Sequence, residues 1–313
     1  MALALSSSSS SSSTSAAAIP SFASAALPNQ RKPRFLSALS FPNRIDAKPP
    51  QLAVRSSLSD GGNKSGLLQA AKHTVDSFVQ SGMLVGLGSG FASGLAINYL
   101  GLQLKAGKLK DITGIPTCVG SASEAAKAGI PLEQYEGSSK IDVAFCDADI
   151  IEEETLSVVI GRRKLMGEES IIYEKTVLGA AKKLVFIVNE TQYKSGLDGA
   201  IPVFIQPFNW METAEAIDDL FLGDAEVWRR PSIGIADPLG GDYPILTKEG
   251  HNVLDVIFTS PITSLADVAE TLEQVDGVVD HGVIYRKPCT AVIAVDNGLR
   301  VVDNNAMVEA KNG

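Results

Sequence analysis

Short apolar segments alternate with helical segments along the chain from residue 66 onward. The strand segments 83–88, 141–148 and 184–190 are apolar at nearly every position, instead of at every second one. Strands of this kind are buried on both faces, and strands that alternate with helices form parallel sheets covered on both sides. The sequence therefore predicts an α/β protein with a Rossmann-like parallel sheet.

In the helix at 121–129, Glu124 follows Ser121 by three residues, which predicts a capping box with Ser121 as the N-cap. The other segments of this region are a strand at 112–117 and helices at 67–79, 93–107 and 169–183.

After residue 200 the order of elements changes to strand, helix, strand, hairpin and helix, which predicts a smaller α+β domain. The final stretch, 278–303, is strand-rich with an Asp-Asn-Gly turn at 296–298, so we expect it to return to the large sheet. This organisation places a main domain at 62–199 and 277–313, with the smaller domain, 200–276, inserted into it. The inserted elements are a strand at 201–208, a helix at 211–222, a strand at 225–231, a hairpin at 242–258 with its turn at 248–252, and a helix at 264–277 that Ser264 introduces.

The first 58 residues differ in composition from the rest of the chain. They are rich in Ser, Ala and Pro, and they carry six basic residues but a single acidic one, Asp46. This composition is typical of an organelle transit peptide. The Met-Ala-Leu start and the serine run favour the chloroplast over the mitochondrion, so we expect the mature protein in the plastid stroma. We expect residues 1–58 to be a disordered transit peptide with its cleavage site near 54–59. The alternative is a disordered tail that carries no targeting signal.

The acidic balance of the chain limits its partners. The full sequence has 27 basic and 36 acidic residues, and without residues 1–58 it has 21 and 35, a net charge of −14. Such a charge repels nucleic acid and anionic membrane surfaces, so neither is expected as a partner. No apolar run reaches the roughly 18 residues that a membrane span needs. The three cysteines and three histidines are scattered, so their spacing predicts neither a disulfide framework nor a metal site.

The segment 86–94, Gly-Leu-Gly-Ser-Gly-Phe-Ala-Ser-Gly, follows a strand and opens a helix. A dinucleotide fingerprint needs Gly-x-Gly-x-x-Gly/Ala, but Phe91 or Ser93 stands where its last residue belongs. A second interpretation is a phosphate loop, in which backbone N–H groups at the helix N-terminus hold a phosphate ester. A plain turn that needs glycines for positive φ or for close packing is the third. The residues of the phosphate loop are Gly88, Ser89 and Gly90.

Two carboxylates, Asp147 and Asp149, lie near the end of the apolar stretch 143–151, Val-Ala-Phe-Cys-Asp-Ala-Asp-Ile-Ile. Side chains in this position either cap a following helix or perform acid–base chemistry. Two carboxylates held close together raise the pKa of one of them, which suits an acid–base role. A further carboxylate, Glu174, lies on the helix that follows.

The order of a glycine turn, an acidic strand end and a Glu on the next helix resembles the type A family of ribose-5-phosphate isomerases. The segments 201–207, 250–258 and 276–285 are similar to further segments of that family. The resemblance extends over about residues 62–313. Together with the N-terminal composition, it predicts a divergent chloroplast-targeted form from a plant, with a lid domain inserted into a Rossmann-like main domain.

The resemblance also implies an activity and a role for each site residue. The family interconverts ribose 5-phosphate and ribulose 5-phosphate through an enediolate, in the non-oxidative pentose phosphate pathway, without a cofactor or a metal. Glu174, before Lys175, corresponds to the base that moves the proton. The alternative is a solvated glutamate on the helix surface. A homo-oligomer, a dimer or larger, is expected. The remaining roles are ring opening for Asp149 and Asp147, oxyanion stabilisation for Lys164, and phosphate binding for Gly88, Ser89 and Gly90.

Several positions depart from the family pattern. Cys146 replaces the first Asp of the family's Asp-Gly-Ala-Asp strand end, and Asp147 stands in its glycine position. The Ser-Thr pair of the glycine loop is Phe91 and Ala92 here, and Lys194 is the candidate for the lysine of a later Asp-x-Ser-Lys motif. Two further hypotheses therefore stay open. One is a catalytically weakened or inactive relative that binds a sugar phosphate or a partner isomerase, and the other is a nicotinamide-dependent enzyme.

Overall fold

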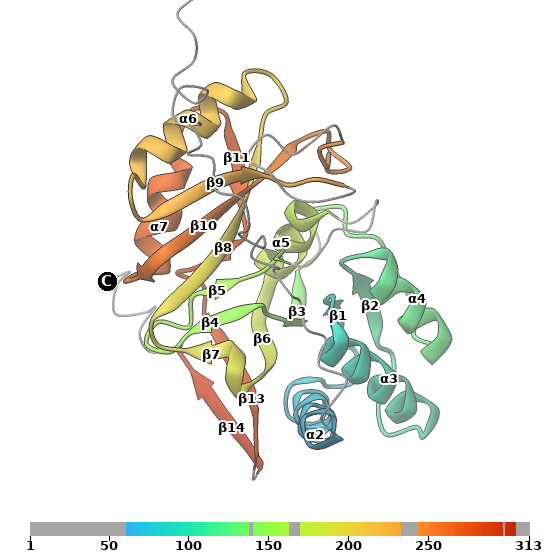
Figure 1. Cartoon of the computed structure of the whole chain (residues 1–313). Coiled ribbons are helices and arrows are strands. Elements are labelled where there is room, and N and C mark those ends of the chain that lie inside the picture. Colours follow the sequence, from blue (N-terminus) through green and yellow to red (C-terminus); the bar gives the residue numbers. More distant parts are fainter. Residues whose placement is uncertain (1–60, 138–139, 163–169, 233–242, 297, 305–313) are drawn as a thin grey trace, which may run out of the picture. The chain divides into compact units, whose positions relative to one another are not determined.

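The computed structural model of the chain describes residues 61–137, 140–162, 170–232, 243–296 and 298–304 (Figure 1). They all belong to one unit of the chain, residues 54–313. No helix among these described residues is long and apolar enough to cross a membrane. The transit peptide expected at 1–58 lies outside them.

Six strands form the largest sheet, in the order β14-β13-β6-β3-β1-β2. Neighbours are parallel except at the edge, where β14 pairs antiparallel with β13. The return of the final stretch to the large sheet is thus confirmed. Val85 of β1 pairs with Gly114 of β2 on one side and with Val143 of β3 on the other. The strand order therefore reverses between β1 and β3, which flank a topological switch point. The bounds are Leu84–Leu87 for β1, Thr113–Pro116 for β2, Ile141–Asp147 for β3, Ala181–Asn189 for β6, Cys289–Val295 for β13 and Gly298–Asp303 for β14.

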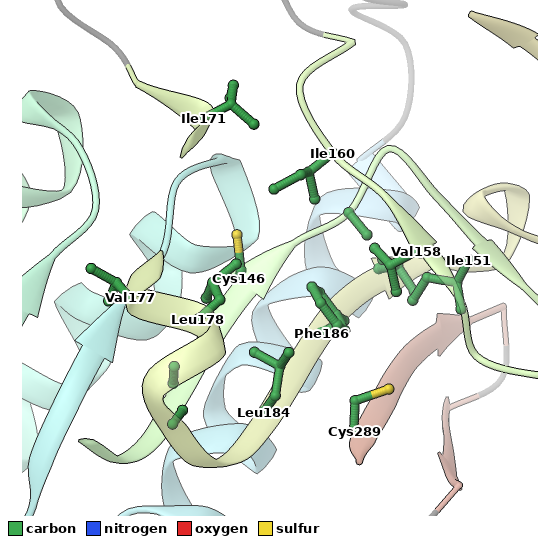
Figure 2. Packing of buried hydrophobic residues seen from close by; sticks show 14 of the residues in the cluster. Cys146, Ile151, Val158, Ile160, Ile171, Val177, Leu178, Leu184, Phe186 and Cys289 are labelled. Atoms are coloured by element: carbon green, nitrogen blue, oxygen red, sulfur yellow. The ribbon is translucent and has the colours of Figure 1, made fainter. Parts of the chain in front are cut away.

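Helices cover both faces of this sheet, as the sequence predicts. Along β3, Val143 and Phe145 belong to the hydrophobic cluster that α2, α3 and α4 share, whereas Ala144 and Cys146 belong to the cluster on the α5 side. Figure 2 shows part of the second cluster, around the fully buried Phe186. Burying a phenylalanine side chain stabilises the fold by about 1.5–3 kcal/mol. The bounds are Gly61–Phe78 for α2, Phe91–Lys105 for α3, Val119–Ala128 for α4 and Ile171–Ala180 for α5.

A second sheet, in the order β11-β8-β10-β9, is antiparallel. One of its faces packs against α6 and α7, through Val203 and Val256 of the sheet among others. Its other face contributes Phe204 and Val253 to the α5-side cluster of the large sheet. The inserted α+β lid is therefore present (Figure 1), and its boundaries at 200 and 276 remain a proposal. The bounds are Leu197–Ile205 for β8, Ala225–Arg229 for β9, Asn252–Ile262 for β10, Val278–His281 for β11, Trp210–Leu220 for α6 and Leu265–Glu273 for α7.

A third, small sheet was not predicted from the sequence. It joins short strands in the order β12-β5-β4-β7, and Ile151 pairs with Val158 at its centre. Both side chains are fully buried, so this sheet extends the core past the end of β3 and fixes the chain that follows Asp149. The bounds are Ile150–Glu152 for β4, Val158–Val159 for β5, Tyr193–Lys194 for β7 and Val283–Ile284 for β12, with a single 3-10 turn, η1, at Glu190–Gln192.

The predicted cap of α4 is wrong, because the helix begins three residues earlier than Ser121 would allow. Its N-cap is Cys118, whose sulfur accepts a hydrogen bond from the Ser121 backbone N–H at 3.4 Å. The Ser121 hydroxyl oxygen accepts in return from the Cys118 N–H at 3.2 Å. Glu124 pairs with Lys127 on the helix surface instead of capping it.

Two further boundaries differ from the prediction. The helix expected over 169–183 ends at Ala180, and the next residues already belong to β6 because they pair with β3 at Ile141 and Val143. Tertiary pairing here overrides the helical preference of the local sequence. The hairpin expected over 242–258 is reduced to a turn closed by a bridge between Leu246 and Asn252, since β10 pairs with β8 and β9. Ser264 caps α7 as predicted.

Candidate active site

The candidate site lies at the carboxyl ends of β1 and β3. The loop 88–90 follows β1, and Asp147 ends β3. Ligands of open α/β sheets bind at this kind of place, next to the topological switch point. A cavity of about 290 Å³ lies between the amino ends of α3 and α4. Its lining includes Gly88, Ser89 and Gly90 from the loop, and Cys118 and Ser121 from α4.

Glu174 lies in the first turn of α5. The helix starts here because the Ser170 hydroxyl caps it, accepting a hydrogen bond from the Tyr173 N–H at 3.0 Å. This start turns the Glu174 side chain inward, where it is only 3% exposed. The alternative of a solvated residue on the helix surface is therefore wrong. A buried carboxylate is costly unless hydrogen bonds satisfy it.

Four donors converge on one oxygen of Glu174. Its Oε1 accepts from the Ser89 N–H at 3.1 Å and from the Ser89 hydroxyl at 2.6 Å. The Thr117 hydroxyl and the Cys146 thiol each donate to the same atom at 3.2 Å. These donors come from the ends of β1, β2 and β3, so the sheet itself orients the carboxylate. Within the described residues no hydrogen bond is made to Glu174 Oε2, so this second oxygen is available to exchange a proton with a ligand.

The Asp147 carboxylate does not cap the helix that follows it in the chain, as its position at a strand end suggests, but an earlier one. Its Oδ1 accepts from the Ser93 N–H and the Ser93 hydroxyl, both at 2.7 Å, and its Oδ2 accepts from the Ala92 N–H at 3.0 Å. The carboxylate thus caps α3, a helix that precedes it by 55 residues, and not the helix that follows it. A carboxylate at a helix N-terminus stabilises the helix by about 0.5–2 kcal/mol.

The glycines of the loop are required by packing. A Cβ atom on Gly88 would overlap the carbonyl oxygen of Phe145 in the neighbouring strand. Gly90 has a φ of +116°, which other residues rarely adopt, and a Cβ there would overlap the Asp147 carboxylate. Close packing therefore explains both glycines without a ligand, as the plain-turn interpretation expects. The phosphate role of the loop stays a prediction.

Asp149 lies two residues after Asp147 but contacts another part of the chain. Its Oδ2 accepts from the Arg162 N–H at 2.8 Å. The Arg162 guanidinium in turn donates to the carbonyl oxygens of Ala200 at 2.5 Å and Asp198 at 2.9 Å. Burial lowers the pKa of Arg162, and the nearby carboxylates, Asp149 first, act against that shift. Asp149 therefore fixes the segment just before residues 163–169, and the predicted Lys164 lies outside the described residues.

Comparison with known proteins identifies the family. Residues 113–298 match the model of ribose 5-phosphate isomerase A (phosphoriboisomerase A). The chain belongs to the ribose 5-phosphate isomerase A family. It is 32% identical over 241 residues to probable ribose-5-phosphate isomerase 2 of Arabidopsis thaliana, a match that covers 75% of this chain and 85% of the relative. The family prediction made from the sequence is thus confirmed.

Two further relatives of this family bear on location and fold. Probable ribose-5-phosphate isomerase 3, chloroplastic, of Arabidopsis thaliana is 29% identical over 239 residues, 74% of this chain and 81% of that protein. The solved ribose 5-phosphate isomerase from Plasmodium falciparum superposes with a TM-score of 0.66 at 27% identity. That match covers 77% of this chain and 99% of the solved one, so it includes both the large sheet and the inserted lid.

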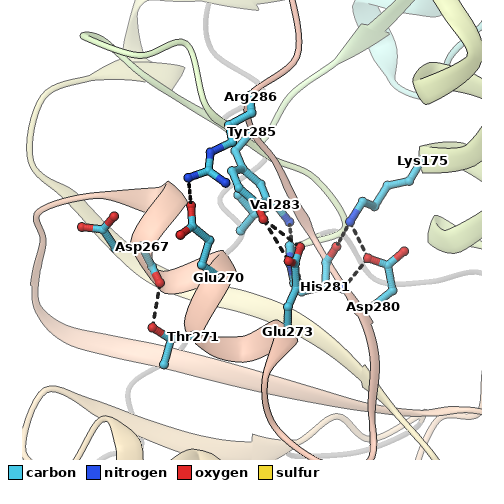
Figure 3. A network of polar contacts seen from close by, with 10 residues as sticks. All are labelled: Lys175, Asp267, Glu270, Thr271, Glu273, Asp280, His281, Val283, Tyr285 and Arg286. Atoms are coloured by element: carbon cyan, nitrogen blue, oxygen red, sulfur yellow. Dashed lines mark hydrogen bonds and ion pairs between the residues drawn. The ribbon is translucent and has the colours of Figure 1, made fainter. Parts of the chain in front are cut away.

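In this member of the ribose 5-phosphate isomerase A family, the residue after the buried Glu174 joins α5 to the lid sheet. Lys175 pairs with Asp280 and donates to the His281 carbonyl oxygen at 2.8 Å (Figure 3). The buried His281 ring accepts from the Val283 N–H at Nδ1, 3.1 Å away, and its Nε2 lies 3.2 Å from Glu273. This network holds α5, and with it Glu174, against β11.

A tyrosine completes the same network. The Tyr285 hydroxyl donates to both oxygens of Glu273, at 3.0 and 2.9 Å (Figure 3). Burial, together with the Glu273 carboxylate, raises the pKa of Tyr285 to about 12. Burial and the charge of Lys175 lower the pKa of His281, so its imidazole is held neutral. The tyrosine and the histidine therefore stay uncharged donors near neutral pH.

Sequence reasoning missed two residues that touch Glu174. One is Thr117, whose hydroxyl follows a strand predicted beside the glycine loop. Its position at the end of that strand is the sequence feature that could have indicated it. The other is Cys146, which the family pattern marks only as the replacement of an aspartate and not as a hydrogen-bond donor. Lys194, the substitute considered for a family lysine, lies on β7 and pairs with Asp198 at 3.9 Å.

Proposed function

We propose that this protein is an aldose–ketose isomerase that interconverts ribose 5-phosphate and ribulose 5-phosphate. One observation carries the proposal: the buried Glu174 carboxylate is held by four donors on Oε1, at the carboxyl ends of three parallel strands. Membership of the ribose 5-phosphate isomerase A family supports the substrate class. One carboxylate oxygen is held in place and the other is available to the substrate, which suits a base that removes and returns one proton.

In the proposed mechanism, Glu174 Oε2 takes the proton from C2 of the open aldose. The C2–H electron pair forms a C1–C2 double bond, and the former carbonyl oxygen O1 becomes the oxyanion of an enediolate. The proton then returns from Glu174 to C1 while the O2 hydroxyl proton passes to the O1 oxyanion, which leaves a ketone at C2 and a hydroxyl at C1. A positioned base contributes about 10²–10⁴ to the rate of such a step. The Ser89, Thr117 and Cys146 donors hold the carboxylate at a fixed orientation through both transfers.

The remaining roles complete the proposal. Asp149, with Asp147 as the second carboxylate, assists ring opening, and its hydrogen bond from the Arg162 N–H orients it. Lys164 stabilises the enediolate oxygen, since a cation beside developing negative charge lowers the barrier. Loop residues 88–90 hold the phosphate. The family resemblance supports a reaction without metal or redox cofactor, so turnover should be insensitive to EDTA and to NAD(P).

We propose that the protein works in the plastid as a homo-oligomer. The Ser-rich, acid-poor composition of residues 1–58 and the chloroplastic relative support the location. A fusion of residues 1–58 to a fluorescent protein should enter chloroplasts, and a fusion in which the six basic residues are replaced by Ser should enter them less efficiently. Light scattering of the purified protein tests the oligomer, and a monomer would overturn that part of the proposal. The acidic net charge supports the absence of nucleic-acid and membrane partners.

The deciding experiment is an isomerase assay on the purified protein with ribose 5-phosphate as substrate. We expect turnover in the usual enzymatic range of about 1–10³ s⁻¹. Absence of turnover, while ribose 5-phosphate still raises the thermal unfolding temperature, would refute the isomerase and support the non-catalytic alternative.

A further inference from the structure

We propose that Asp147 determines how tightly this site accepts the phosphate group of its substrate. Its carboxylate occupies the amino end of α3 as an internal anion, and the substrate phosphate must compete with it for the same donors. The inference rests on the proposed function, and specifically on phosphate binding at residues 88–90 and the helix that they open.

Five donors of the loop and of this helix end are already in use. The Ala92 N–H, the Ser93 N–H and the Ser93 hydroxyl all point to Asp147, at distances of 2.7–3.0 Å. Ser89 gives both its N–H and its hydroxyl to Glu174. A phosphate ester that approaches the loop therefore meets backbone and hydroxyl donors that two carboxylates already hold.

The helix has no anionic or side-chain cap of its own. Its N-cap residue is Gly90, which has no side chain to accept a hydrogen bond, and its first turn contains no acidic residue. The positive end of a 15-residue helix attracts an anion. Asp147 supplies that anion from β3. The same electrostatic attraction that would hold a phosphate is thus satisfied from within the protein.

The loop is shaped around this carboxylate. The backbone N–H of Asp147 donates to the Ser89 carbonyl oxygen at 3.3 Å, so the strand end and the loop are joined. Gly90 leaves open the space that the Asp147 carboxylate fills, since a Cβ atom at Gly90 would overlap it. The contact is therefore packed on both sides and is not a chance orientation of a surface side chain.

A phosphate and a carboxylate cannot share these donors at low cost, because both are anions. Either Asp147 turns away when the phosphate arrives, or the phosphate binds with fewer hydrogen bonds. In both cases the charge of Asp147 weakens phosphate binding. One charge-assisted hydrogen bond corresponds to roughly a tenfold change in affinity. A sugar without phosphate does not compete for this place, so loss of the Asp147 charge should not tighten its binding.

The test compares two substitutions at Asp147 with a matched control on the same strand. Asp147→Asn removes the charge but keeps an oxygen that can accept from the Ala92 and Ser93 N–H groups, so the cap of α3 survives. Asp147→Gly removes the side chain entirely. Asp142→Asn is the control, because Asp142 lies at the opposite end of β3 and contacts Lys182 and the Leu84 N–H.

The measurement is calorimetric binding of inorganic phosphate, ribose 5-phosphate and unphosphorylated ribose, after thermal unfolding has shown that each variant is folded. We expect both Asp147 variants to bind inorganic phosphate and ribose 5-phosphate about tenfold tighter than the unsubstituted protein. Asp142→Asn should bind both as the unsubstituted protein does, and ribose should bind no tighter to either Asp147 variant than to the unsubstituted protein.

Phosphate affinity that is unchanged or lower in folded Asp147→Asn would overturn the inference. Equal tightening in Asp142→Asn would also overturn it, because the effect would then be one of general charge. Turnover is recorded in parallel, so that the two proposals can fail separately. If the unsubstituted protein shows no isomerase activity but the Asp147 variants gain phosphate affinity, the proposed function fails and the role of Asp147 stands.

Discussion

The Ser89 hydroxyl donates a 2.6 Å hydrogen bond to Glu174 Oε1, although the two residues are 85 positions apart in the sequence. The contact joins the loop after β1 to the first turn of α5. It connects the cavity that Ser89 lines with the carboxylate that the proposed reaction needs.

Ser89→Ala removes this hydroxyl donor while the Ser89 N–H remains. Because the carboxylate loses one of its four anchors, we expect kcat to fall by about tenfold. Ser89→Thr restores the hydroxyl and should recover most of the activity. Thr74→Val is the matched control, since Thr74 is a buried hydroxyl of α2 that bonds the Ala70 carbonyl. An unchanged kcat in Ser89→Ala would show that this contact does not orient the base.

Gly90→Ala should lower the free energy of unfolding. The backbone conformation of Gly90, φ +116° and ψ 176°, costs a non-glycine residue about 1–3 kcal/mol, and the overlap with Asp147 adds to this. Gly94→Ala is the matched control four residues later. It lies inside α3 with open space around its Cα, so it should be neutral or stabilise by about 1 kcal/mol. Urea unfolding separates the two, and equal stability of both variants would contradict the packing argument.

Asp280→Asn breaks the ion pair with Lys175, which is partly buried, with the two side chains 24% and 19% exposed. We expect it to cost about 1–3 kcal/mol of stability, because a sheltered charge loses its partner. Lys182→Met breaks the pair with Asp142, in which Lys182 is 60% exposed, and should cost about 0–1 kcal/mol. A smaller loss in Asp280→Asn than in Lys182→Met, measured by urea unfolding, would refute the anchoring role of this network.

Below the ordinary pKa of histidine, the free energy of unfolding should decrease as the pH falls, and His281 is the cause. Burial and the charge of Lys175 lower its pKa in the folded protein, while Asp280 and Glu273 act in the opposite direction. Between the lowered pKa and about 6.5, the unfolded chain binds the extra proton and the folded protein does not. The His281 contribution to stability is therefore complete above about pH 6.5 and is lost as the pH falls, by at most about 1.4 kcal/mol per pH unit.

The measurement for His281 is urea unfolding at pH 7.5 and pH 5.5. His281→Asn keeps an acceptor for the Val283 N–H but cannot take up a proton. The variant should lose less stability between the two pH values than the unsubstituted protein. An equal loss in both proteins would assign the pH dependence to other groups.

The sequence was sufficient for the architecture because the signals of the fold are local. The strands around Val85 and Phe145 are apolar on both faces, and Ser264 caps α7 from the adjacent residue, so these elements could be predicted within a few positions. The lid was visible in the changed order of elements after residue 200. Errors occurred where a distant partner decided the outcome, as at Ala181, which joins β6 because β3 pairs with it.

The site was predictable in part for the same reason. The position of Glu174 followed from the family resemblance, and its burial agrees with a working carboxylate. The partner of Asp147 could not be predicted, because a carboxylate at a strand end normally caps the next helix and this one caps α3. Nor could the sequence show that Cys146 and Thr117 meet at a single oxygen, since three strands must first be aligned in the sheet.

The central claim is that Glu174 carries the proton between C2 and C1, and Glu174→Gln tests it most directly. The amide keeps the shape and can still accept at Oε1, but it cannot remove a proton. Turnover of ribose 5-phosphate is measured for this variant and for Glu212→Gln, an exposed residue in the first turn of α6. The account predicts a fall in kcat of at least about 10² for Glu174→Gln and none for Glu212→Gln. Unchanged turnover in a folded Glu174→Gln variant would contradict it.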